Sequence, residues 1–170
     1  ATKYLAGHND VLAGVVVTDN ADLYEKLFYN LNTTGAVLSP FDSYQLIRGL
    51  KTLSLRMERS TANAQEIVAF LEQSPAVKEV LYTGRGGMIS FKVADEKRIP
   101  HILNTLKVFS FAESLGGVES LITYPTTQTH ADIPSEVRHS YGLTDDLLRL
   151  SIGIEDARDL IEDLRQALEG

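Results

Sequence analysis

The sequence predicts an α/β protein in which a layered α/β unit comes first and an α+β part with a mainly antiparallel sheet follows. Residues 11–17 form a continuous apolar run rich in β-branched residues, which is typical of a strand covered on both faces. Ile89, Phe91 and Val93 alternate with polar residues, as in a strand with one solvent-facing side. Helical patterns lie between and after these runs, so strands and helices are mixed along the chain.

A long apolar stripe with helical spacing suggests where the two parts meet. The stripe begins after Pro40 and continues to Leu71. Because globular helices usually have roughly 8–20 residues, we expect a kink or break within residues 54–60. A helix of this length often bridges two domains. We therefore divide the chain into residues 1–58, the end of a larger domain, and residues 59–170, an α+β domain.

The other expected elements are shorter. Each is predicted from apolar periodicity together with a cap, a glycine or a proline at its end. They are a helix between Asn20 and Gly35, a helix after Asp95, strands at 108–111 and 120–124 separated by Gly116 and Gly117, a helix at 134–141, a strand at 148–152 and a last helix carrying Leu160 to Leu168.

The composition excludes several classes of function. The 170 residues carry a net charge of −7 without a cluster of Lys and Arg, which argues against a nucleic-acid surface. The longest apolar run is far shorter than the roughly 20 residues of a membrane span. Because cysteine is absent, there is no disulfide or thiolate chemistry, which fits the cytoplasm. The chain opens at Ala1 without Met, and we interpret this start as a cut: a trimmed boundary, a processed terminus or the start of the second piece of a longer protein.

Three places carry residues suited to chemistry. Lys3 is a candidate Schiff-base lysine and Thr2 a candidate phosphate contact, although a lysine near a chain end is most often a solvated charge. Arg149 alternates with apolar neighbours in a predicted strand, where a guanidinium can hold a carboxylate; the alternative is an ordinary surface arginine. Glu113 and Ser114 precede two glycines that permit close approach of a ligand or form a plain turn.

A metal site is not indicated by the histidines. His8 with Asp10 and His130 with Asp132 each form a His-x-Asp pair, but neither pair has a third ligand at a regular spacing. We assign them structural or surface roles. The sequence also lacks a nucleophile elbow, a phosphate-binding glycine-rich loop and a dinucleotide fingerprint.

The order of five motifs resembles a known family over essentially the whole chain. This family contains the cystathionine γ-synthases and the cystathionine β- and γ-lyases, pyridoxal-phosphate (PLP) enzymes of cysteine and methionine metabolism. The resemblance implies the end of an aspartate-aminotransferase-like, fold type I large domain. The matching stretches are ATKYLAGHND at 1–10, GLKTL at 49–53 with Arg56 and Met57, AESLGGVES at 112–120, Thr129 with His130, and LRLSIGIED at 148–156.

The resemblance also implies roles for individual residues. Lys3 matches the lysine that binds PLP and later moves protons, and Thr2 matches a hydroxyl that contacts the cofactor phosphate. Arg149 and Ser114 match groups that bind the substrate α-carboxylate, and Thr129 matches a residue at the same pocket wall. Glu113 occupies a position that varies between activities, where glutamate is more similar to the synthase and γ-lyase branches.

The implied activity is trans-sulfuration. Our first hypothesis is cystathionine γ-synthase, which replaces the acyl group of O-acyl-homoserine by cysteine; cystathionine β- or γ-lyase is the alternative. The family implies amino-acid substrates, a cytoplasmic location and a homo-oligomer, a tetramer built of dimers. A rival hypothesis from another class is a non-catalytic structural piece.

Two departures from the family pattern are evident. The N-terminal half, with the acidic partner of the pyridine nitrogen and the aromatic stacked on the ring, has no counterpart before Lys3. We therefore expect the 170-residue chain alone to be inactive. The link at residues 82–87 is also shorter than the family pattern leads us to expect.

Overall fold

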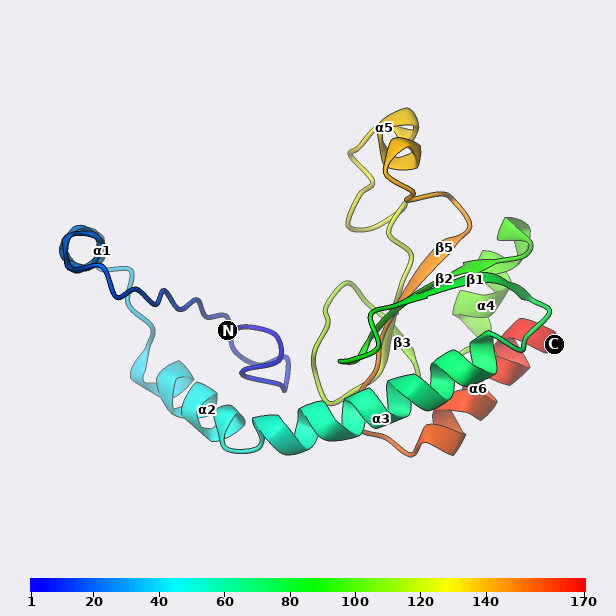
Figure 1. Ribbon diagram of the computed structural model, residues 1–170, viewed down its shortest axis with the longest axis horizontal. Helices are drawn as coiled ribbons and strands as arrows, with labels where there is room; N and C mark the ends of the chain where they lie inside the picture. The colour runs from blue at the N-terminus through cyan, green and yellow to red at the C-terminus, as the bar shows by residue number, and fades with distance from the viewer.

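The computed structural model describes all residues, 1–170. Helices α1 (Ala21–Thr34) and α2 (Pro40–Leu50) lie at one end of an elongated molecule, and the N-terminal segment lies between them and the sheet (Figure 1). Helix α3 (Leu53–Leu71) runs from α2 to the other end, where the sheet and the remaining helices gather.

The early helices follow the predicted capping signals. The Asn20 side chain accepts from the amide of Leu23 at the start of α1, and Gly35 ends that helix with a φ of 68°. Ser39 caps α2 in the same way, with Pro40 in the first turn. The predicted helix between Asn20 and Gly35 is confirmed.

The expected break within residues 54–60 is wrong, because α3 is continuous through them. The chain instead turns at Lys51 and Thr52, whose amides bond to the carbonyls of Arg48 and Gly49 three residues earlier. These tight bonds end α2 one turn before the predicted region. The boundary proposed between residues 58 and 59 falls inside α3.

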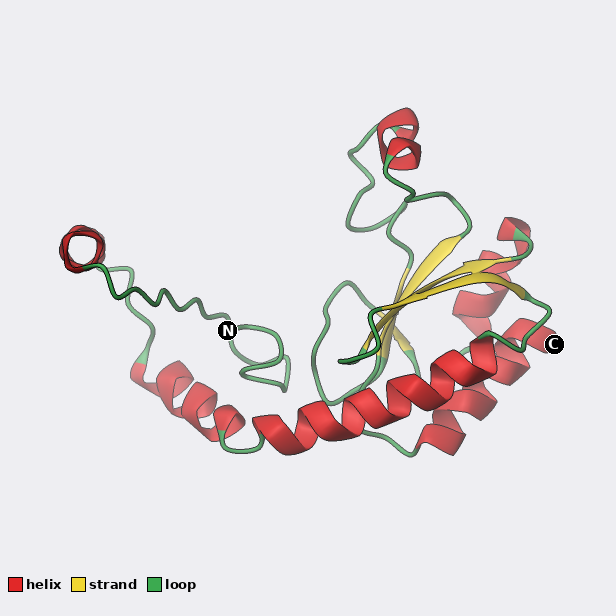
Figure 2. Ribbon diagram, in the orientation of Figure 1, coloured by secondary structure: helices red, strands yellow, loops and turns green.

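A five-stranded sheet occupies the C-terminal part of the chain (Figure 2). Its order is β1-β2-β5-β4-β3, and all neighbours are antiparallel except β3 and β4, so the predicted mainly antiparallel sheet is confirmed. Strand β1 was not predicted from the sequence. The strands are β1 (Val77–Tyr82), β2 (Met88–Val93), β3 (Ser110–Phe111), β4 (Leu121–Thr123) and β5 (Leu147–Ser151).

Helices cover one face of this sheet. Helix α3 contacts β1, β2 and α6 (Ala157–Glu169), and α6 also contacts α4 (Ile99–Thr105), which follows a 3₁₀ turn at Glu96–Arg98. Helix α5 (Ser135–Ser140) stands away from the sheet at the top of Figure 1. The side chains of Ile89, Phe91 and Leu150 form part of one core of 17 buried apolar residues on the covered face.

The opposite face carries polar side chains at the centre of the sheet. Arg149 in β5 is directly opposite Ser90 in β2 and Thr123 in β4. Residues opposite one another in neighbouring strands point to the same side of a sheet, so these three share one face. The sheet therefore holds Arg149 on a rigid element, on the side away from the covering helices.

Residues 11–17 do not form the strand that their apolar run predicts. Val11 is buried, but Leu12 is 85% exposed and Val17 is 89% exposed. A strand needs a neighbouring strand for its backbone hydrogen bonds, and no strand of this chain lies beside the run. A segment whose composition suits a strand covered on both faces is therefore exposed in this chain.

Candidate active site

Lys3 lies in a compact turn at the start of the chain. The amide of Ala6 bonds to the carbonyl of Ala1 at 3.0 Å, and the amide of Gly7 bonds to the carbonyl of Lys3 at 2.8 Å. Gly7 has a φ of 80°, and a Cβ there would lie 2.2 Å from Arg56 Nη1. Only glycine meets both conditions, which is a physical reason for its place after the lysine.

Arg56 of α3 holds this turn against the helices. Its guanidinium donates to the carbonyls of Tyr4 and Gly49, each at 2.8 Å, and Nε donates to Thr52 Oγ1 at 3.1 Å. Burial lowers the pKa of Arg56, and no carboxylate pairs with it. Backbone carbonyls, among them one at the C-terminal end of α2, therefore stabilise the charge.

The amine of Lys3 meets the loop that follows β3. Lys3 Nζ donates to Ser114 Oγ at 3.2 Å, across more than a hundred residues of sequence. Lys3 has no ion pair with a carboxylate. The structure thus brings together two residues that were singled out separately in the sequence.

This loop is fixed from beneath by the end of β5 and the residues after it. The amide of Gly116 donates to Ser151 Oγ at 2.8 Å, and the amide of Ser120 donates to Glu155 Oε1 at 2.6 Å. The hydroxyl of Ser120 also donates to Glu155 and accepts from the amide of Gly153. These buried bonds hold the Ser114 loop in one place relative to β5.

Arg149 reaches the same loop from the sheet. Its Nη2 donates to the carbonyl of Glu113 at 2.9 Å and to Thr123 Oγ1 at 3.1 Å, while its buried Nε has no hydrogen-bond partner. Burial lowers the pKa of Arg149, and the nearby charge of Glu113 partly offsets this effect. A buried donor without a partner costs about 1–3 kcal/mol, so the site fits an added acceptor.

Thr2 and Thr129 stand apart from this cluster. Thr2 Oγ1 accepts from the amide of Ala13 at 2.9 Å and also contacts the Ala13 carbonyl. Thr129 Oγ1 is 2.7 Å from His130 Nδ1, and no hydrogen bond joins it to Lys3 or Arg149. The roles of both threonines stay predictions.

The histidine pairs form no metal centre. His8 bonds to the carbonyl of Ala6, and Asp10 accepts from Gln45. No three His, Asp or Glu side chains are grouped to hold a metal ion.

No helix has the length and apolar character needed to cross a membrane.

Sequence reasoning missed two residues of this cluster. Asn9 accepts from Ser114 Oγ, and it has a φ of 56°, which asparagine tolerates better than most residues. Thr123 contacts Arg149 because their strands are in register, which the sequence does not reveal. For Asn9 the available signal was its place in the matching stretch at residues 1–10, to which no individual role was given.

Comparison with known proteins shows the family of the chain. Residues 1–169 match the family described as the Cys/Met metabolism PLP-dependent enzymes. The chain belongs to this family. A cystathionine gamma-synthase/O-acetylhomoserine (thiol)-lyase of Bacillus subtilis is 58% identical over 168 residues, 99% of this chain and 45% of that protein. A cystathionine gamma-synthase of Haemophilus influenzae is 54% identical over 166 residues, 98% and 45% of the two chains.

Lyases of the PLP-dependent family are similar as well. A cystathionine gamma-lyase of Bacillus subtilis is 51% identical over 185 residues, 99% of this chain and 49% of that protein. The crystal structure of a cystathione gamma lyase from Micromonospora echinospora superposes with a TM-score of 0.96 at 38% identity, covering 99% of this chain and 49% of its own. The chain thus spans about half the length of the relatives it matches.

The residues present fit the cofactor PLP. The cofactor of this family is an aldehyde that bonds to a primary amine, and Lys3 offers such an amine without a carboxylate partner. The unpartnered Nε of Arg149 is suited to a carboxylate. Both groups contact the same loop, Lys3 at Ser114 and Arg149 at Glu113.

Proposed function

We propose that the protein to which this chain belongs is a trans-sulfuration enzyme in which Lys3 carries PLP and Arg149 binds the substrate α-carboxylate. The observation that carries the proposal is the convergence of the two side chains. Lys3 contacts Ser114, and Arg149 contacts the adjacent carbonyl of Glu113. An amine and a guanidinium thus contact neighbouring residues of one loop. This arrangement can bind an amino-acid substrate by its carboxylate while the reaction takes place at its Cα.

The residues divide the work. PLP, when bound, supplies an electron sink for the charge that develops at the substrate Cα. Arg149 orients the carboxylate, and the sheet keeps its guanidinium in place. Lys3 Nζ takes the proton from the substrate Cα and returns one later, acting as a general base and then as a general acid. Ser114 holds the amine at the loop between these transfers.

Within the family, γ-synthase is our first choice. Glu113 lies exposed beside Arg149, and a glutamate at this position favours the synthase and γ-lyase branches. The alignment with the γ-lyase extends over 185 residues, more than this chain contains, whereas those with the two synthases extend over 168 and 166. The lyase therefore has residues without a counterpart here.

The short link is where we infer that these extra residues fall. Thr83, Arg85 and Gly86 line a pocket together with Tyr4, the residue after Lys3. A longer link would start at that pocket, one residue along the chain from Lys3. The short link thus supports a distinction between the synthase and lyase branches.

A chimera tests the proposal. The N-terminal half of the Bacillus subtilis cystathionine gamma-synthase/O-acetylhomoserine (thiol)-lyase is joined before Ala1 to give a complete enzyme, hereafter the chimera. Given PLP, O-acyl-homoserine and cysteine, it should form cystathionine, and Lys3→Ala should abolish the product. If the chimera instead only cleaves cystathionine, one of the lyase activities replaces the synthase. No PLP adduct on Lys3 after borohydride reduction would refute the site itself.

For the 170-residue chain by itself we propose a structural piece without turnover. It supports Lys3 and Arg149 but spans about half of its relatives. The purified chain should leave cystathionine intact in the presence of PLP. Turnover by the chain alone would show that the N-terminal half is dispensable.

A further inference from the structure

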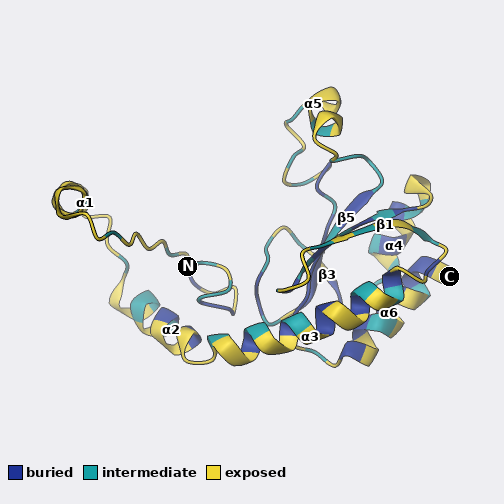
Figure 3. Cartoon of the chain, in the orientation of Figure 1, coloured by how far each residue is buried: buried dark blue, intermediate teal, exposed yellow.

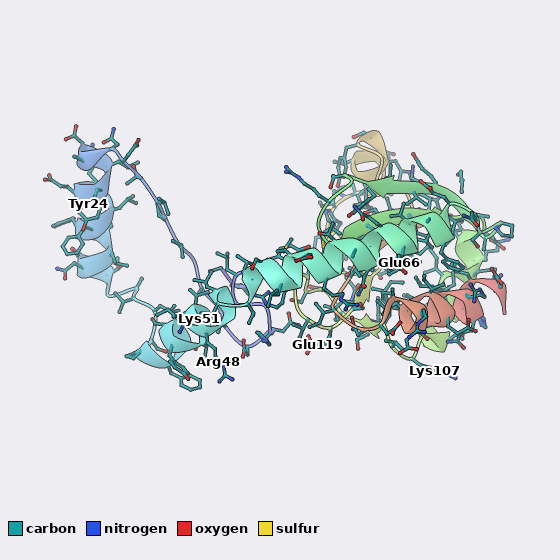
Figure 4. The ribbon with its side chains drawn as sticks, turned by 60° about the horizontal axis from the view of Figure 1, so that its bottom comes forward. Tyr24, Arg48, Lys51, Glu66, Lys107 and Glu119 are labelled. Atoms are coloured by element: carbon teal, nitrogen blue, oxygen red, sulfur yellow. The ribbon has the colours of Figure 1, made fainter.

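Four side chains form an unbroken line of hydrogen bonds that begins at Lys3. Lys3 Nζ lies 3.2 Å from Ser114 Oγ, and Ser114 Oγ lies 3.1 Å from Asn9 Oδ1. Asn9 Nδ2 lies 3.0 Å from Glu119 Oε2. Glu119 is at the junction between the N-terminal segment and the sheet part of the molecule (Figure 4).

Chemistry fixes the direction of each bond. A carboxylate only accepts, so the NH₂ group of Asn9 must face Glu119 and its carbonyl oxygen must face Ser114. A hydroxyl has a single proton, and that of Ser114 is given to the Asn9 carbonyl. Ser114 therefore meets Lys3 as an acceptor.

The backbone conformation at Asn9 and the absence of a side chain at Gly117 make these hydrogen bonds possible. Asn9 sits in the left-handed region at a φ of 56°. A Cβ on Gly117 would lie 2.4 Å from Asn9 Nδ2, so any side chain at that position would displace the amide. The second glycine of the Ser114 loop thus gives space to Asn9.

We propose that Asn9 and Glu119 are positioning residues that keep the lone pair of the Lys3 amine free. A hydroxyl next to a neutral amine can either accept from its N–H or donate to its nitrogen. Donation would occupy the lone pair that must take a proton or attack an aldehyde. By holding the Ser114 proton, Asn9 prevents this donation, and Glu119 prevents Asn9 from turning its amide around. The inference rests on the proposed role of Lys3.

The test measures the Lys3 amine directly in the 170-residue chain, without PLP. Trace acylation with acetic anhydride followed by peptide mass spectrometry gives the rate at Lys3 relative to exposed Lys97. Asn9→Gly tolerates the same φ but lacks the acceptor, so the Ser114 proton becomes free to bond to the amine. Acylation of Lys3 should slow by roughly two- to tenfold, the factor that one hydrogen bond supplies.

A second variant reverses the direction of these hydrogen bonds by a change at Glu119. Glu119→Lys replaces an acceptor by a donor, so the Asn9 amide should turn and Ser114 should donate to Lys3. Acylation should again slow, whereas an added positive charge alone disfavours protonation of a nearby amine and would speed it. Because Glu119 is exposed and touches neither Lys3 nor Ser114, this variant should keep the fold.

A rescue variant completes the test. Asn9→Asp combined with Glu119→Lys places a group that can only accept between two donors, which restores the original direction. The double variant should recover the acylation rate of the parent chain. Unchanged rates in both single variants, or a double variant as slow as Glu119→Lys, would overturn the proposal. Either result leaves PLP attachment in the chimera untouched, so the two proposals fail separately.

Discussion

The two main residues of the proposed site, Lys3 and Arg149, lie in regions of very different construction. The N-terminal region, residues 1–50, buries only Ala6, Val11 and Leu46 as an apolar cluster. The C-terminal region, residues 53–170, buries 17 apolar residues in one core. Figure 3 makes the contrast visible, with α1 exposed along its length and the central strand β5 largely buried. Lys3 is therefore held by polar tethers, whereas Arg149 is held by a packed sheet.

The largest effect we expect comes from the core of the C-terminal region. Phe91 is fully buried in β2, between β1 and β5. Phe91→Ala should reduce the free energy of unfolding of this region by about 3–5 kcal/mol, because the cavity loses contacts on all sides. Chemical denaturation followed by circular dichroism measures the loss.

Leu46→Ala is the matched truncation in the N-terminal region. Leu46 belongs to the three-residue cluster and is 9% exposed. Its loss should lower stability by about 2 kcal/mol or less, since few neighbours surround it. Equal losses in the two variants would mean that the two regions share one cooperative core.

The next effect tests the polar tether of Lys3. Arg56→Met keeps an apolar stem but leaves the half-buried carbonyl of Tyr4 without its donor, at about 1–3 kcal/mol, whereas the Gly49 carbonyl keeps its bond from the Thr52 amide. Amide hydrogen exchange of Ala6 and Gly7 should accelerate by roughly tenfold or more, since 1.4 kcal/mol corresponds to tenfold. Exchange in the sheet should stay as it is.

Arg158→Met is the control for this tether. Arg158 pairs with Asp156 at the surface, and its side chain is 87% exposed. Such a pair contributes little to stability, so exchange of Ala6 and Gly7 should not change. Acceleration in both variants would show that loss of any guanidinium loosens the N-terminal turn.

A smaller effect is expected where the rigid region meets the substrate. Arg149→Lys in the chimera keeps a positive charge but loses the planar guanidinium and its free Nε. Amino-acid substrates should bind about 10-fold more weakly, which is about 1.4 kcal/mol. The measurement is the KM for O-acyl-homoserine, with surface Arg165→Lys as control. An unchanged KM would place the carboxylate elsewhere.

The C-terminal region was predictable from its sequence because its residues are satisfied within the chain. The alternation around Phe91 gave β2, and the apolar neighbours of Arg149 gave β5 with the guanidinium on the opposite face. Strand β1 was not predicted because a strand at the exposed edge of a sheet does not require a regular apolar pattern.

The candidate site was predicted in part. The motifs identified Lys3, Ser114 and Arg149 separately, but only the folded chain brings them to one loop. The contacts of Arg56 with the Lys3 turn and of Thr123 with Arg149 join residues far apart in sequence. Such contacts depend on strand register and on the helix turn at Lys51, neither of which leaves a local signal.

In the 170-residue chain the smallest expected effect concerns residues 11–17, the run whose predicted strand does not form. Val17 is 89% exposed, so Val17→Ser should change the stability of the 170-residue chain by no more than about 0.5 kcal/mol. In the chimera we expect the added half to cover the run, and the same substitution should then cost about 1.5–3 kcal/mol, the value of burying a valine. Thermal unfolding of both proteins with and without the change gives the comparison. Equal small effects would show that the run stays exposed in the complete enzyme, and that its composition has another cause than a covered strand.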